Sequence, residues 1–122
     1  MLPAVPDSVR ISRRLVRDLC LLMGLVEVAE IAELLTGEVT TNVVLHTRTP
    51  ILRMAAEVIG GKLRVCVSDS DPHLPIVREP SQKEQSGRGL VLVKMLSKEW
   101  GAVQRPGGKV VWFTLSTDSH AG

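Results

Sequence analysis

Aromatic residues and cysteines are scarce in this sequence. There is no tyrosine, and the aromatic residues are Trp100, Trp112 and Phe113 among 122 positions. Proteins that bind single-stranded nucleic acids stack bases on aromatic rings, so this composition argues against that class. The two cysteines, Cys20 and Cys66, have no second cysteine or histidine at metal-ligand spacing. We therefore expect no zinc site and interpret both cysteines as buried, reduced thiols.

Long apolar runs and an excess of one charge are also absent. The longest apolar run, Leu19 to Val26, is far shorter than the roughly 20 residues of a membrane-spanning helix. Pro3, Pro6 and Asp7 interrupt any signal-peptide core, so we expect a cytoplasmic protein without a membrane partner. Fifteen Lys and Arg against thirteen Asp and Glu leave a formal charge of +2. That imbalance does not bind a polyanion by itself, and we expect no direct nucleic-acid partner.

The composition and apolar patterning predict one folded α/β domain over residues 1–122. Hydrophobic residues make up 44% and charged residues 23%, as in globular proteins. Helical spacing of apolar residues predicts helices over 9–23, 26–45 and 89–97, the first with N-cap candidates at Pro6-Asp7-Ser8 and a C-cap at Gly24. Alternation predicts strands over 51–58, 63–69, 100–104 and 109–115, with a hairpin at Gly60-Gly61. This order fits a sheet with helices on one face, frayed ends at 1–6 and 116–122, and a loop over 70–86.

The second predicted helix carries a carboxylate and a carboxamide on one side. Glu38 and Asn42 are four residues apart, so they project from the same face, one turn above the other. Asn offers a neutral oxygen to Mg²⁺, while Glu can take a proton from an attacking hydroxyl or water. A solvated helix face would show the same spacing, so the pair gains meaning only with further features. Gly37, inside this helix, indicates close packing, a kink or a close backbone approach.

Two further positions could bind a nucleotide. Gly87-Arg88-Gly89 precedes an apolar helix, where bare amides and the helix dipole favour a phosphate, although a tight turn explains the glycines equally well. Asp69 ends a strand, from where its carboxylate can accept a hydrogen bond from an exocyclic amine or simply cap a turn. Taken in order along the chain, these features are far more specific than any one of them.

This combination resembles the GHKL superfamily over nearly the whole chain, the ATP-binding fold of gyrase, heat-shock chaperone, histidine kinase and mismatch-repair ATPase. More closely, residues 32–46 look like the N box of small bacterial anti-sigma-factor serine kinases and their single-domain ATP-binding relatives. Later segments look like further motifs of that group: 86–93, Trp100-Gly101 and 108–113. The resemblance implies a two-layer α/β sandwich with a mixed sheet, helices on one face and a lid over 70–86.

The resemblance also implies a role for each candidate residue. Asn42 would ligate Mg²⁺ beside ATP, and Glu38 would be the general base that activates a serine hydroxyl or water. Asp69 would bind the adenine. The phosphates would contact Gly87, Arg88 and Gly89.

Two main functional interpretations follow. In the first, the chain is an ATP-dependent protein serine/threonine kinase and anti-sigma factor, which binds a sigma factor and phosphorylates an anti-anti-sigma factor. Several relatives dimerise, which leaves a homodimer open. In the second, it is a protein-binding module with a degenerate pocket, because Asp69 is followed by Ser-Asp-Pro-His where the superfamily has glycines. Arg13 and Arg17, on the basic side of the first helix, are candidates for a protein interface or, less favoured, a nucleic-acid contact.

Overall fold

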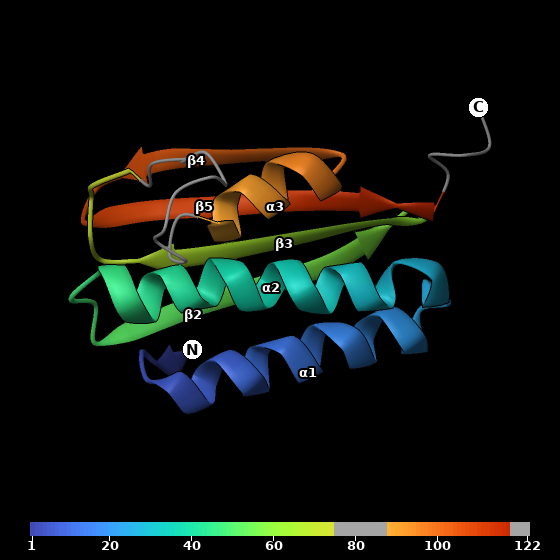
Figure 1. The fold of residues 1–122 in the computed structure, drawn as a ribbon, viewed down its shortest axis with the longest axis horizontal. Helices are drawn as coiled ribbons and strands as arrows, with labels where there is room; N and C mark the ends of the chain where they lie inside the picture. The colour runs from blue at the N-terminus through green and yellow to red at the C-terminus, as the bar shows by residue number, and fades with distance from the viewer. Residues whose placement is uncertain (75–87, 118–122) are drawn as a thin grey trace.

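Three helices cover one face of a five-stranded sheet in the computed structural model, which describes residues 1–74 and 88–117 (Figure 1). The elements in chain order are β1 (Leu2–Pro3), α1 (Pro6–Leu22), α2 (Val26–His46), β2 (Ile51–Ile59), β3 (Lys62–Asp69), α3 (Arg88–Leu96), β4 (Glu99–Arg105) and β5 (Gly108–Ser116). The predicted α/β architecture with helices on one face is therefore confirmed. None of the helices in the described ranges is long and apolar enough to span a membrane.

The sheet has the strand order β1-β2-β3-β5-β4, and every described pairing is antiparallel. The sheet is thus antiparallel rather than mixed, because two tight turns reverse the chain between neighbouring strands. Gly60 and Gly61 take left-handed φ values of 59° and 78° between β2 and β3, as predicted for a two-residue hairpin. Pro106 and Gly107, with φ of 81° at the glycine, turn β4 into β5.

The helices α1 and α2 form an antiparallel hairpin whose interface is built from small side chains. The buried residues of α1 recur every fourth position: Ser8, Ser12, Val16 and Cys20. On α2, Gly37 lies beneath Arg13, and a Cβ at Gly37 would be 2.8 Å from the Cδ of that arginine. Arg13 and Arg17 also approach Glu33 at 3.9 and 3.8 Å. Gly37 therefore marks close packing between helices, one of its predicted roles.

The core lies between the helices and the inward face of the central strands. Leu63, Val65 and Val67 of β3 stand opposite Leu115, Phe113 and Val111 of β5, and all six are buried. From the helix side the core receives the apolar stripe of α2 and two residues of α3: Val28, Ala32, Leu35, Val39, Val43, Leu90 and Val93. The sheet thereby positions the end of β3 and the start of β5 near the C-terminal end of α2 (Figure 1).

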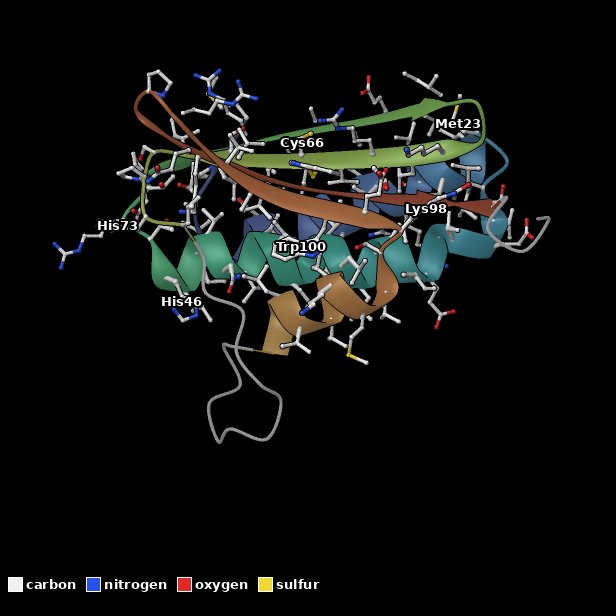
Figure 2. The ribbon with its side chains drawn as sticks, turned by 90° about the horizontal axis from the view of Figure 1, so that it is seen from above. Met23, His46, Cys66, His73, Lys98 and Trp100 are labelled. Carbon is white, nitrogen blue, oxygen red and sulfur yellow. The ribbon has the colours of Figure 1, made fainter. Side chains whose placement is uncertain are left out.

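The structure differs from the sequence prediction at the N-terminus and at one cysteine. Leu2 and Pro3, expected to fray, pair with Leu52 and Ile51 of β2, a contact that depends on a distant strand. Helix α1 begins with Pro6 itself, and no described side chain caps it. Cys20 is buried, and burial raises the pKa of its thiol. Cys66 is only half-buried, on the sheet face away from the helices (Figure 2).

Candidate functional site

Glu38 and Asn42 lie one turn apart on α2, and both are half-buried. The flank of α2 that faces α1 is identified by Gly37, which Arg13 covers, and by Glu33, which the same arginine approaches. With about 3.6 residues per turn, Glu38 and Asn42 project from the other flank. Figure 1 shows α3 on that side of α2. The structure thus directs both predicted residues toward α3 and away from α1.

Asp69 ends β3 on the face of the sheet that the helices cover. Leu63, Val65 and Val67 point into the core, and the strand alternation continues this inward direction to Asp69. Its side chain is only 1% exposed. The strand end predicted to carry the carboxylate is therefore confirmed, with the additional finding that the carboxylate is buried.

Lys109 is the charged partner of Asp69. It stands directly opposite Asp69 in the β3–β5 register, and its side chain is 6% exposed. The Nζ atom donates to Asp69 Oδ1 at 3.1 Å and to the backbone oxygen of Asp71 at 3.0 Å. A buried carboxylate needs a partner of opposite charge, because removal from water is costly for an isolated ion. Asp69 and Lys109 therefore form a buried ion pair at the end of the sheet.

One oxygen of this buried carboxylate retains an unused acceptor. Asp69 Oδ1 accepts from Lys109 and also from the backbone amide of Asp71 at 2.8 Å. Asp69 Oδ2 lies 3.0 Å from Lys109 Nζ, yet it accepts no hydrogen bond of acceptable geometry from any described residue. A buried acceptor without a donor is costly, so such an atom requires an explanation. A ligand that donates a hydrogen bond would satisfy it.

The turn that follows Asp69 is held by side chains from three other parts of the chain. Thr49, before β2, accepts a hydrogen bond from the Ser70 amide at 2.8 Å. Lys109 donates to the Asp71 carbonyl, and Gln104 of β4 donates to the Pro72 carbonyl at 2.8 Å. All described non-glycine residues have negative φ, so this turn does not use the left-handed conformation that would favour glycine. The Ser-Asp-Pro-His sequence is therefore compatible with an ordered turn here.

A glycine is nevertheless required on the neighbouring strand. Gly108, the first residue of β5, is buried, and a Cβ added there would overlap the backbone oxygen of Asp69. The close backbone approach thus occurs at Gly108 rather than within the turn after Asp69. This arrangement allows Lys109 to reach both the carboxylate and the turn.

Asp71 and His73 complete the turn at its exposed side. The His73 amide donates to Asp71 Oδ1 at 2.9 Å, and the ring Nδ1 lies 2.8 Å from the same oxygen. These two contacts, the backbone one first, hold the pKa of the Asp71 carboxyl below its usual range. Figure 2 shows His73 and His46 at one end of the molecule, with Met23 and Lys98 at the other. The turn and the C-terminal end of α2 therefore share an end of the fold.

The glycine motif before α3 is described only in part. Gly87 lies outside the described residues, whereas Arg88 and Gly89 form the first turn of α3. Residue 89 was expected as the helix start, and the helix begins one residue earlier. The first amide groups of a helix lack intrahelical acceptors, and they carry the positive end of the helix dipole. The start of α3, at position 88, therefore offers backbone donors of the kind that a phosphate requires.

The candidate residues described by the structure fit a magnesium nucleotide. The unpartnered Oδ2 of Asp69 suits an exocyclic amine, and the Asn42 carboxamide oxygen is a ligand type that Mg²⁺ accepts. The amide groups that open α3 suit phosphate oxygens. Figure 1 places the end of β3, the C-terminal half of α2 and the start of α3 toward the same end of the helix-covered face. Four predicted positions, 38, 42, 69 and 88, are therefore arranged around one region.

Lys109 belongs to this region, and the sequence analysis does not predict its role. The signal was available, because Val111, Phe113 and Leu115 alternate toward the core and Lys109 extends the same series by two positions. A lysine in an inward series calls for a buried partner of opposite charge. Identifying Asp69 as that partner requires the strand register, which the sequence does not specify.

Comparison with known proteins identifies the family of this chain. The family described as the histidine kinase-like ATPase domain matches residues 2–115. Among solved structures, the chain is similar to the histidine kinase domain of the blue-light activated histidine kinase from Erythrobacter litoralis EL346, with 26% identity and a TM-score of 0.55. That match covers 74% of this chain and 45% of the other, so the chain spans less than half of that protein. The comparison with curated proteins gave no match. Since the family covers nearly the whole sequence, the chain belongs to the histidine kinase-like ATPase domains.

Proposed function

We propose that this chain is an ATP-binding regulatory protein that acts as an anti-sigma factor and a protein serine kinase. The observation that carries the proposal is the placement of Glu38 and Asn42, half-buried and one turn apart, on the flank of α2 that faces α3. Membership of the histidine kinase-like ATPase family supports ATP as the ligand. The resemblance of residues 32–46 to the N box of anti-sigma kinases supports serine as the acceptor.

In this proposal each part of the region binds one part of the nucleotide. Asp69 Oδ2 accepts a hydrogen bond from the amino group of adenine, which satisfies its buried lone pair. The backbone amides of Arg88 and Gly89, at the start of α3, bind phosphate oxygens, and Gly87 is proposed from the sequence alone as a further phosphate contact. Asn42 supplies a carboxamide oxygen to Mg²⁺. When bound, the metal neutralises developing charge on the phosphates.

Glu38 then acts as general base toward a serine of a partner protein. Its carboxylate takes the hydroxyl proton as the serine oxygen attacks the γ-phosphorus of ATP. The bond from oxygen to phosphorus forms while the bond from the γ-phosphorus to the bridging oxygen breaks. The electron pair leaves with ADP, and the products are phosphoserine, ADP and protonated Glu38. Half-burial of Glu38 limits the access of water that would otherwise compete as acceptor.

The proposed partners are a sigma factor, which the chain sequesters, and an anti-anti-sigma factor, which it phosphorylates in the cytoplasm. A homodimer is compatible with this scheme. The basic side of α1 contributes to the protein interface through Arg14, which is exposed. Arg13 and Arg17 approach Glu33 of the same chain, so charge reversal there would also disturb the α1–α2 packing. Arg14→Glu is therefore the cleaner test of this interface.

Phosphoproteomics in the source organism tests the kinase proposal. Strains that lack the gene are complemented with wild type, Glu38→Gln, Asn42→Ala or the control Glu30→Gln, which changes an exposed carboxylate on the same helix. We expect one phosphoserine that wild type and Glu30→Gln restore and that the other two variants do not. If purified Glu38→Gln binds ATP and every phosphosite persists in its strain, the kinase proposal is refuted.

The alternative is a protein-binding module without phosphoryl transfer. One observation favours it: the buried Asp69 carboxylate is already paired with the Lys109 ammonium of the same chain. This alternative predicts that partner binding is the same with and without ATP, and that Asn42→Ala leaves it unchanged. The phosphoproteomic experiment separates the two, because a pure binding module would leave every phosphosite intact in the deletion strain.

A further inference from the structure

We propose that Lys109 is a second base-reading residue, which donates a hydrogen bond to ring nitrogen N1 of adenine while Asp69 accepts one from the 6-amino group. This inference rests on the proposed ATP binding and assigns the chemistry that selects the base. It starts from the buried ion pair rather than from the N box.

The buried pair has more hydrogen-bonding groups than the described residues use. An ammonium has three N–H donors, and described residues accept two of them, at Asp69 Oδ1 and at the Asp71 carbonyl. Asp69 Oδ2 retains an acceptor, as no described residue donates to it with acceptable geometry. One donor and one acceptor therefore remain, on atoms 3.0 Å apart.

A ligand that satisfies both buried groups at once needs a donor for Asp69 Oδ2 and an acceptor for Lys109 Nζ, close to one another. The Watson–Crick edge of adenine provides both, with the 6-amino group as donor and N1 as acceptor, and proteins read unpaired bases through that edge. A protonated alkyl amine has donors but no acceptor, so it would leave the Lys109 N–H group unsatisfied, at a cost in affinity.

The pair is also held in place by contacts within the protein itself. Asp69 is fixed by Lys109 and by the Asp71 amide, while Lys109 is fixed by the Asp71 carbonyl. Gly108 brings the backbones of β3 and β5 close enough for these contacts. A preorganised donor and acceptor lose little conformational entropy on binding, which favours discrimination between bases.

Binding of nucleotide analogues to the wild-type chain tests the inference without any mutation. Calorimetric titrations use ATP, 1-deaza-ATP, which replaces N1 by CH, and purine riboside triphosphate, which lacks the 6-amino group. We expect each analogue to bind roughly tenfold or more weakly than ATP, because each leaves one charged hydrogen-bonding group unpaired. GTP carries the donor and acceptor in the reverse order, and we expect it to bind at least tenfold more weakly too.

Substitution then assigns each loss to its residue. Lys109→Met should bind ATP and 1-deaza-ATP equally while still preferring ATP over purine riboside triphosphate. Lys98→Met, at the opposite end of the molecule, serves as the matched control and should keep every ratio of the wild type (Figure 2). If Lys109→Met does not fold, the double variant Asp69→Asn with Lys109→Met removes both buried charges and should lose the discrimination against 1-deaza-ATP.

The outcomes separate this inference from the proposed function. If the wild type binds ATP and 1-deaza-ATP with equal affinity, Lys109 does not read N1 and the inference alone is overturned. Equal affinity for ATP and GTP overturns the assignment of the base. If wild type binds no ATP at millimolar concentration, the proposed function fails and the inference fails with it.

Discussion

The contribution of the buried ion pair between Asp69 and Lys109 to stability can be measured, because an exposed ion pair with the same N···O distance serves as its control. Lys109 Nζ lies 3.0 Å from Asp69 Oδ2, with side chains 6% and 1% exposed. Lys62 Nζ lies 3.0 Å from Glu99 Oε1, with side chains 44% and 56% exposed. The separations are equal, so the difference between Lys109→Met and Lys62→Met reports burial together with the hydrogen bond that Lys109 also donates to the Asp71 carbonyl.

Lys109→Met should be strongly destabilising. It leaves a buried carboxylate without its counter-charge and the Asp71 carbonyl without its donor, and such a loss costs about 3–5 kcal/mol. For a domain with about 5–15 kcal/mol of total stability, this lowers the melting temperature by about 10 °C or more. Lys62→Met should have little effect, because water screens the exposed pair.

Urea unfolding of the two single variants and of the double variant Asp69→Asn with Lys109→Met provides the measurement. The double variant should be more stable than Lys109→Met, since it no longer contains an unpaired buried charge. A loss below about 1 kcal/mol for Lys109→Met would refute the reasoning, because the lysine would then contribute no more than a surface residue. So would additive losses in the double variant.

Two further predictions concern the same region and the helix packing. Gly108→Ala should lower the unfolding free energy far more than Gly37→Ala. The new Cβ meets strand backbone at Gly108, whereas at Gly37 it meets only the flexible Arg13 side chain, and alanine there also gains about 1 kcal/mol of helix propensity. Urea unfolding compares the two variants, and equal losses would contradict the packing described. The pKa of Asp71 is lowered in the folded chain, so its contribution to stability is present above the unfolded value of 3.8 and is lost as pH falls through the folded value. His73→Ala should raise this pKa only in part, because the hydrogen bond from the backbone amide of residue 73 remains. An NMR titration of the Asp71 carboxyl in both proteins measures the two effects, and an unshifted pKa in the wild type would contradict the hydrogen bonds described.

Local patterns were sufficient to predict the main elements and the turns between them. Helix and strand periodicity identified all the long elements to within about three residues, because each element buries one regular apolar face. Gly60-Gly61 identified its hairpin because the left-handed conformation strongly favours glycine. The two-residue strand β1 escaped prediction, since so short a segment has no periodicity and forms only against β2.

In the candidate site, too, local spacing could be predicted from the sequence and long-range contacts could not. Glu38 and Asn42 were predictable because both lie on one continuous helix, where spacing alone determines that they share a face. Asp69 could be placed at a strand end, but its burial and its partner Lys109 depend on the register between β3 and β5. That register connects residues 40 positions apart and follows from tertiary packing rather than from local sequence.

Calorimetric titration of ATP into the purified protein, with Mg²⁺ and with EDTA, tests whether the chain binds magnesium ATP through Asn42. The control variants are Asn42→Ala and, on the exposed side of the same helix, Glu30→Ala. We expect magnesium-dependent binding by wild type and Glu30→Ala and loss of that magnesium dependence in Asn42→Ala. Equal binding by wild type and Asn42→Ala, or no binding by wild type at millimolar ATP, would contradict it.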